Sequence, residues 1–252
     1  MGQLLHTSRD VGPRVTLLDG FSVRSGRAAD RPAAGELPPA VQRVVAHLCL
    51  ADRPARTAVS GSLWPGVSED RAQASLRSAL WRLRRSAPEL LDTSSGGTLR
   101  VTAGVRVDVR ELHAWAGRVC DPRAPVEQVV LPDPALLGDL LPGWYDDWVL
   151  LERDRLAQLR LHALETLAAR LGAAGRHAEA LEAAHLAIRA EPLRESAHRT
   201  AVRVHLAEGN VAEALRAHDL FRDLLYDELG VQPTEQMTRL VRGIPRLRRI
   251  AS

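Results

Sequence analysis

The sequence predicts a mainly α-helical protein with a small β component, in which a mixed N-terminal part precedes an all-helical C-terminal part. Only 4% of the 252 residues are aromatic while 45% are hydrophobic, so the core must consist mostly of Leu, Val and Ala, which suits helices. Short apolar runs bounded by turn residues occur in the first 110 residues, as expected of strands. After residue 144, helical periodicity and a 34-residue repeat dominate instead.

The first predicted elements are a hairpin and a helix. Two apolar runs at residues 15–18 and 21–24 are separated by Asp19-Gly20, a dipeptide typical of tight hairpin turns. Residues 25–38 are rich in Gly, Ala and Pro and predict a loop with room for one more strand. Pro39 then begins a helix, because proline suits the first turn and apolar residues follow at helical spacing.

Two more helices follow. Residues 58–64 predict a short helix, with Thr57 as its N-cap, that stops at Pro65-Gly66. Ser68 is placed to cap a third helix, which must end before Pro88.

A second hairpin closes this part of the chain. Leu90-Leu91, a glycine-rich turn and an apolar run from residue 98, continued by the alternating Val105, Val107 and Val109, predict a strand and a returning strand. Strands, three helices and a terminal hairpin together predict a winged helix–turn–helix domain over residues 14–110, after a disordered lead at residues 1–13. We expect residues 1–110 to contain a complete core and to fold alone.

The C-terminal half predicts a repeat domain. Residues 118–143 are rich in proline and form the expected linker, and Trp144, Tyr145 and Trp148 are expected to anchor the entry to the helices. The tetrapeptide AEAL occurs at residues 178–181 and again at 212–215, a period of 34 that is typical of tetratricopeptide helix pairs. We therefore expect an all-α, tetratricopeptide-like domain at residues 111–244 and a basic tail at residues 245–252.

Charge is unevenly distributed. Residues 1–110 hold 16 Arg and 10 acidic residues, a net charge of +6, whereas residues 111–252 hold 18 Arg and 21 acidic residues, a net charge of −3. This asymmetry indicates that only the N-terminal part meets a polyanion. All 34 basic residues are Arg, which excludes a lysine-dependent phosphate loop or Schiff-base enzyme in this sequence.

The third helix carries the strongest functional signal. The stretch from Arg71 to Arg85 holds five arginines, and at 100° per residue its apolar side chains gather on one face: Ala72, Leu76, Ala79, Leu80 and Leu83. A solvated surface helix is the plain alternative, but such a helix would carry both signs of charge, and no acidic residue occurs between Asp70 and Glu89. We predict DNA contacts from this helix and from Arg100 in the returning strand: Arg71, Ser75, Arg77, Ser78, Arg82, Arg84, Arg85 and Arg100.

The remaining polar and aromatic residues predict no catalytic, cofactor or metal site. Glu182/His185 and Glu195/His198 have the spacing of di-iron bundles, but such sites also need glutamates from two further helices, and Pro192 separates the two units. We expect His177, His205 and His218 on helix surfaces or in a groove, and Trp64 and Trp81 inside the small domain or at its edge. Two lone cysteines, no long apolar run and no signal peptide indicate a cytoplasmic protein.

Several motifs together resemble one family. The stretch LWPGVSEDRAQASLRSALWRLRR, with VDVREL after it, resembles the winged-helix domain of the Streptomyces antibiotic regulatory proteins (SARPs). Three later stretches, LLPGWYDDWVLLERDRL, EPLRESAHR and LLYDELGVQP, look like the bacterial transcriptional activator domain that follows it. The resemblance implies an OmpR-type winged helix before a tetratricopeptide-like domain.

The resemblance also implies a function. Members of this family are similar in binding tandem direct repeats of double-stranded DNA near promoters and in recruiting the RNA polymerase holoenzyme, with an antibiotic biosynthesis cluster as the usual target and a homodimer on DNA as one arrangement. The alternative is a tetratricopeptide-type interaction module whose basic half binds nucleic acid without promoter specificity. A salt-sensitive preference for one duplex sequence would separate the two.

Overall fold

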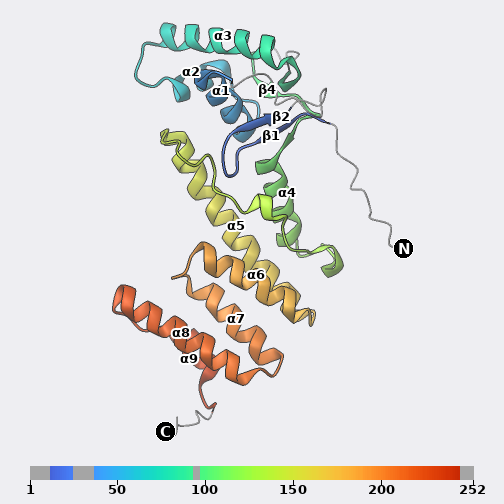
Figure 1. Ribbon diagram of the computed structural model, residues 1–252, viewed down its shortest axis with the longest axis vertical. Helices are drawn as coiled ribbons and strands as arrows, with labels where there is room; N and C mark the ends of the chain where they lie inside the picture. The colour runs from blue at the N-terminus through green and yellow to red at the C-terminus, as the bar shows by residue number, and fades with distance from the viewer. Residues whose placement is uncertain (1–11, 25–36, 93–96, 245–252) are drawn as a thin grey trace, which may run out of the picture. The chain divides into compact units, whose positions relative to one another are not determined.

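The computed structural model describes residues 12–24, 37–92 and 97–244. It confirms a mainly helical fold with a small β component, and it separates into two compact units (Figure 1). The first unit contains residues 1–114 and 132–157, and the second contains residues 115–131 and 158–252. The predicted lead, the extra strand, the tip of the second turn and the basic tail lie wholly or mostly outside the described residues.

The first hairpin forms as predicted. Strands β1 (Arg14–Thr16) and β2 (Ser22–Arg24) pair antiparallel, with Val15 opposite Val23. Asp19 and Gly20 have positive φ values of 59° and 131°, a conformation that Asp tolerates and Gly adopts freely. A third strand, β5 (Arg106–Val107), lies parallel to β1 on its other side.

Three helices follow, with small differences at their ends. They are α1 (Pro39–Leu50), α2 (Arg56–Leu63) and α3 (Glu69–Ser86). The prediction of Thr57 as an N-cap is wrong, because α2 already begins at Arg56, where a backbone bridge between Ala55 and Thr98 fixes the chain. Ser68 does occupy the N-cap position of α3, but its hydroxyl makes no capping hydrogen bond.

The second hairpin is shorter than predicted. After a 3-10 turn (Pro88–Leu90), strands β3 (Leu91–Asp92) and β4 (Arg100–Val101) pair antiparallel. The alternating residues 105–109 do not continue β4, because β5 joins the first sheet and helix α4 (Asp108–Cys120) begins directly after it.

Asp108 explains this switch of direction. Its carboxylate accepts the backbone N–H groups of Leu17 and Leu18 at 2.8 Å each and that of Val109 at 2.7 Å. Burial raises the pKa of Asp108, and these three N–H bonds oppose the rise. One buried side chain thus joins the end of β1 to the start of α4, a helix that the sequence reasoning missed.

The first unit also contains chain from beyond the predicted domain. The N–H of Leu141 donates to the carbonyl of Leu17 at 2.8 Å, and Arg43 forms an ion pair with Asp146. Several residues beyond position 110 are buried here, among them Leu112, Leu140, Leu141 and Val149. The expectation that the core is complete at residue 110 is therefore wrong. The boundary between the winged-helix domain and the activator domain, placed between residues 110 and 111, stays a prediction.

Aromatic residues hold this added segment in place. Trp144 stacks on Phe21, with ring centroids 6.1 Å apart, and Trp148 meets the edge of His47 at 5.3 Å. These two tryptophans therefore pack on the N-terminal hairpin and on α1, rather than anchoring only the helices that follow. Tyr145, by contrast, is 80% exposed, so the prediction of an anchor is wrong for it.

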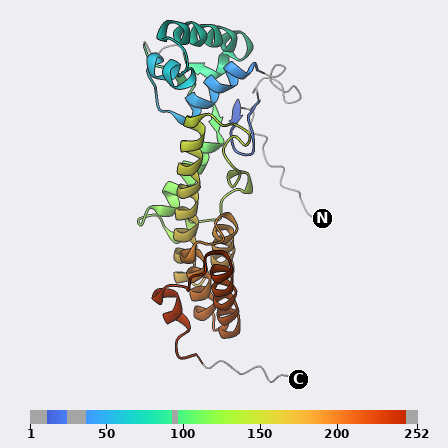
Figure 2. The same cartoon turned by 90° about the vertical axis from the view of Figure 1, so that its left-hand side faces the viewer.

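The helices predicted after residue 144 are present. Two 3-10 turns (Val126–Gln128, Pro134–Leu136) precede α5 (Asp147–Ala173), and four more helices follow: α6 (His177–Ala190), α7 (Glu195–Ala207), α8 (Val211–Leu229) and α9 (Glu235–Val241). Consecutive helices α6, α7 and α8 pack side by side (Figure 2). Within the described ranges, no helix has both the length and the apolar character needed to span a membrane.

The 34-residue repeat has a structural cause. Gly175 and Gly209, which precede α6 and α8, both turn the chain with positive φ, at 75° and 84°. Ala180 and Ala214, one turn into these helices, are fully buried, so neighbouring helices can approach closely. The repeated residues thus mark equivalent turns and equivalent helix contacts of a tetratricopeptide-like fold.

Candidate nucleic-acid interface

Helix α3 is strongly two-sided, as predicted. Its buried residues are the five predicted ones: Ala72, Leu76, Ala79, Leu80 and Leu83. All five arginines and Ser78 are exposed, and Ser75 is half-buried. In Figure 1 the helix lies along the outside of α1 and α2.

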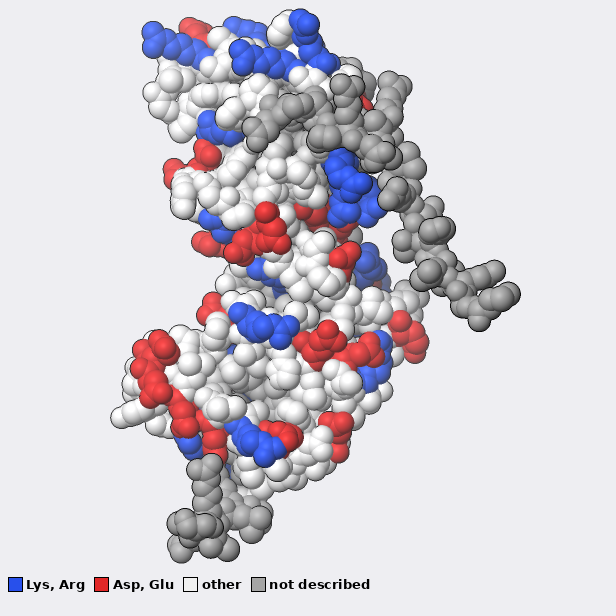
Figure 3. All heavy atoms as spheres, in the orientation of Figure 1, with Lys and Arg blue, Asp and Glu red and all other residues white. Residues whose placement is uncertain are grey.

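Helix α3 concentrates on one helix five arginines that lack ion-pair partners in the described part of the chain. Within the described residues, the five arginines of α3 have no ion pair: Arg71, Arg77, Arg82, Arg84 and Arg85. The acids nearest in sequence lie at the two ends of the helix, with Glu69 and Asp70 in its first turn and Glu89 beyond its last residue. In the second unit, several arginines pair with acids three residues away or one helical turn away, as in Arg216–Glu213, Arg222–Asp219 and Arg239–Glu235. Exposed arginines without an ion pair among the described residues occur there too, but they are scattered over separate segments: Arg118, Arg123, Arg189 and Arg203. Figure 3 shows the resulting band of basic side chains over α3. A helix decorated only for solubility would carry the mixed pattern, so the unpaired cations favour an anionic partner.

A shallow groove runs beside the basic face. Its volume is about 360 Å³, and small side chains from α3 form much of its wall: Ala74, Ser75, Ser78 and Ala79. Arg82 and Trp64 line the same groove. Small residues beside an arginine let another molecule approach the helix backbone while the guanidinium reaches out.

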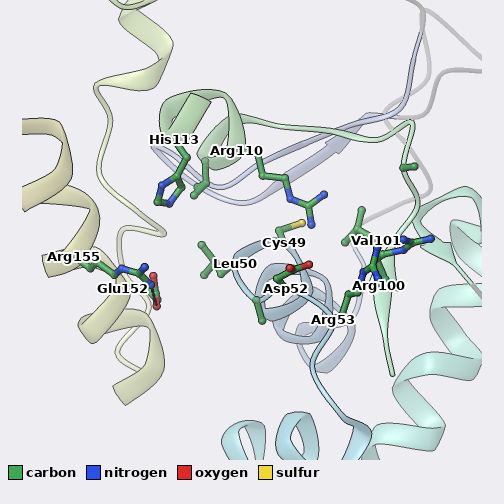
Figure 4. A pocket seen from close by; sticks show the side chains of 13 residues that line it. Cys49, Leu50, Asp52, Arg53, Arg100, Val101, Arg110, His113, Glu152 and Arg155 are labelled. Carbon is green, nitrogen blue, oxygen red and sulfur yellow. Dashed lines mark hydrogen bonds and ion pairs between the residues drawn. The ribbon is translucent and has the colours of Figure 1, made fainter. Parts of the chain in front are cut away.

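Arg100 lies in a different setting from the arginines of α3. Its Nε donates to Asp92 on the paired strand at 3.1 Å, so part of its charge is already compensated. Arg100 borders a hollow of about 440 Å³. In Figure 4, Arg53 lies on the same side of this hollow as Arg100, and the other side holds His113, Glu152 and Arg155. A phosphate contact by Arg100 stays a prediction, and it would have to compete with Asp92.

Trp81 is the main departure from the predicted site. It is 58% exposed, so the prediction that it packs inside the small domain or at its edge is wrong. Trp64 is half-buried, in agreement with that prediction. The low aromatic content of the chain made burial of Trp81 the reasonable expectation, and only its position on the helix, opposite the apolar face, could have signalled otherwise.

Histidines and cysteines have structural surroundings. His198 stacks on Phe221 with ring centroids 4.2 Å apart, and His218 is 5% exposed, so the prediction of a surface or groove position is wrong for His218. In the part of the chain that the structure describes, no three His, Cys, Asp or Glu residues are arranged to hold a metal ion. Burial raises the pKa of the Cys49 thiol to about 12, and Cys120 is half-buried and unpaired.

Comparison with known proteins connects this geometry to regulators of transcription. Residues 134–244 match the family model of the bacterial transcriptional activator domain. Over 238 residues the chain is 31% identical to regulatory protein AfsR of Streptomyces coelicolor, a match that covers 88% of this chain and 23% of that protein. It is 30% identical to regulatory protein AfsR of Streptomyces griseus, with 89% and 24% covered. The chain thus spans about a quarter of the length of these curated relatives.

A solved structure supports the fold. The chain is similar to EmbR of Mycobacterium tuberculosis, solved in complex with a low-affinity phosphopeptide, with a TM-score of 0.62 and 18% identity. The similarity covers 90% of this chain and 63% of that one, so both units have counterparts in a single known protein.

Proposed function

Because the chain belongs to the Streptomyces antibiotic regulatory protein family, we propose that it is a transcriptional activator that binds a specific duplex DNA sequence through α3. The observation that carries this proposal is the exposed face of α3, with five arginines that have no ion-pair partner among the described residues. In a winged helix–turn–helix, the helix after the turn enters the major groove, and arginine is the side chain that reads guanine edges most often.

The proposal assigns the two units different tasks. The first unit contacts DNA with Arg71, Ser75, Arg77, Ser78, Arg82, Arg84, Arg85 and Arg100. Residues 111–252, which comprise the second unit together with residues 111–114 and 132–157 of the first, carry a net charge of −3 and add no net attraction for phosphate, so the C-terminal helices are assigned protein contacts. Helix pairs of this kind form surfaces that suit a second copy of the chain or RNA polymerase.

The finer points of the proposal follow from the family. The protein acts in the cytoplasm without an enzymatic step of its own, binds direct repeats near a promoter and recruits RNA polymerase, at a cluster for antibiotic or other secondary-metabolite synthesis. Two chains held side by side on two repeats would raise affinity over one repeat by about a hundredfold, since the second site is then occupied at high effective concentration.

The test begins with selection of preferred duplexes from a randomised pool by the full-length protein. Arg82→Ala is then expected to weaken binding to the selected duplex by about 1–3 kcal/mol, the value of one guanine contact, without changing the circular dichroism spectrum. The matched control is Arg216→Ala, which removes an exposed arginine of the second unit that is paired with Glu213. It is expected to leave DNA affinity unchanged.

Two outcomes would contradict the proposal. A protein that enriches no sequence and binds all duplexes equally would instead be the interaction module with a non-specific basic half. Equal losses of affinity in Arg82→Ala and Arg216→Ala would show that general charge, and not the exposed face of α3, governs binding.

A further inference from the structure

Trp81 is the one tryptophan of this chain that the fold leaves exposed. All five tryptophans lie in the described ranges, and Trp81 is 58% exposed while the others are buried or half-buried. Trp115, for example, is 4% exposed, and its indole N–H donates to the carbonyl of Val130 at 2.9 Å. Single exposed apolar side chains are common on protein surfaces, so what makes Trp81 informative is its place among the arginines of α3, for which the described residues supply no ion pair.

Trp81 lies on the outermost line of α3. At 100° per residue, its side chain is almost opposite the five buried residues of the helix. Positions 74, 78, 81 and 85 share this line, and they hold Ala74, Ser78, Trp81 and Arg85. The side chain of Trp81 therefore cannot reach the core, and it lies on the side of α3 that a bound molecule would contact first.

The neighbours of Trp81 suit a nucleic acid. Ala74 and Ser78 are small and precede it on the same line, so the helix can approach a groove until the indole makes contact. Arg85 lies over the indole, with its guanidinium carbon 4.8 Å from the ring centroid. This cation–π contact holds the arginine in place before DNA binds, which lowers the conformational entropy that binding must remove.

The apolar feature of the major groove that matches an indole face is the 5-methyl group of thymine. We propose, on the basis of the DNA-binding function proposed above, that Trp81 is a specificity-determining contact whose indole packs on a thymine methyl while Arg85 reaches the adjacent base edge or phosphate. Because the phosphate groups carry no methyl group of this kind, the contact distinguishes thymine from the other bases, which arginine contacts to guanine or phosphate do not.

The experiment removes each side of the contact separately. The thymines of the selected duplex are replaced one at a time by deoxyuridine, which lacks only the methyl group, and the full-length protein is compared with Trp81→Ala and Trp81→Phe. For the wild type, one replacement is expected to weaken binding about fourfold, the value of one buried methyl-sized group. Trp81→Ala is expected to bind the unmodified duplex at least about tenfold more weakly and to be insensitive to that same replacement, whereas Trp81→Phe keeps part of the sensitivity.

Leu220→Ala is the matched control, because Leu220 is a 72% exposed apolar residue on α8. It is expected to change neither affinity nor the response to deoxyuridine. If the wild type prefers a sequence but Trp81→Ala responds to deoxyuridine as the wild type does, the assignment of Trp81 is overturned while the proposed function stands. If Trp81→Ala weakens specific and random duplexes equally, the contact carries no specificity, which also overturns it. If the wild type prefers no sequence, the proposed function fails and this inference fails with it.

Discussion

Replacing Asp108 tests whether one buried carboxylate holds the first unit together. Asp108 is 2% exposed and accepts three backbone N–H groups, from Leu17, Leu18 and Val109. In Asp108→Ala these donors lose their acceptor, and a buried donor without a partner costs about 1–3 kcal/mol. Allowing for partial relaxation, we expect the free energy of unfolding of the first unit to fall by roughly 3–6 kcal/mol, a large share of the 5–15 kcal/mol typical of a domain.

Asp108→Asn should be milder. Its amide oxygen can still accept from Leu17 and Leu18, but its NH₂ group then faces the N–H of Val109, so about one hydrogen bond is lost and roughly 1–2 kcal/mol with it. The control is Asp133→Ala, which removes an exposed aspartate that accepts one N–H, from Ala135. This change should cost no more than about 1 kcal/mol.

The assay combines urea unfolding, followed by tryptophan fluorescence, with hydrogen exchange of the segment after β1. Because the chain has two compact units, exchange at Leu17 and Leu18 reports the local effect that a single unfolding curve can hide. If Asp108→Ala and Asp133→Ala have equal midpoints and equal exchange rates, the carboxylate does not organise this junction and the reasoning fails.

Three further predictions concern charge, chain length and cysteine chemistry. Arg100→Ala should lower the slope of log affinity against log salt by less than one, since Asp92 already compensates part of its charge; a fall of a full unit would show that it binds phosphate freely. A chain of residues 1–157 should unfold cooperatively while a chain of residues 1–110 should not, as measured by circular dichroism; equal, sharp transitions would contradict the added core segment. Cys120 should react with a thiol reagent at pH 8 while Cys49, buried and with its pKa raised to about 12, reacts only on unfolding; two fast thiols in the native protein would refute this.

The sequence predicted those elements whose form depends on residues close together in the chain. The buried face of α3 follows from residues three and four apart, and the hairpin at Asp19-Gly20 follows from backbone preferences of two residues. The 34-residue period was visible for the same reason, since Gly175 and Gly209 mark equivalent left-handed turns.

Contacts between distant parts of the chain were not predictable in this way. The strand pairing of Arg106–Val107 with β1, and the helix that starts at Asp108, depend on a carboxylate that reaches residues 90 positions earlier. The exposure of Trp81 was missed for a different reason. The scarcity of aromatic residues favoured burial of Trp81, although the helical periodicity places it opposite the apolar face of α3, where the structure leaves it exposed.

The late completion of the first unit affects how the protein is made. Leu18 forms a backbone bridge with Leu140, and Leu17 accepts the N–H of Leu141, so these contacts must wait until both segments have left the ribosome. At synthesis rates of about 5–20 residues per second, that delay is roughly 6 to 24 s. During it, the segment after β1 lacks a partner that it has in the finished protein, and unpaired strand edges invite association with other chains. A nascent chain that stalls before residue 140 is therefore a candidate for chaperones and proteases, and not a smaller working copy of the N-terminal unit.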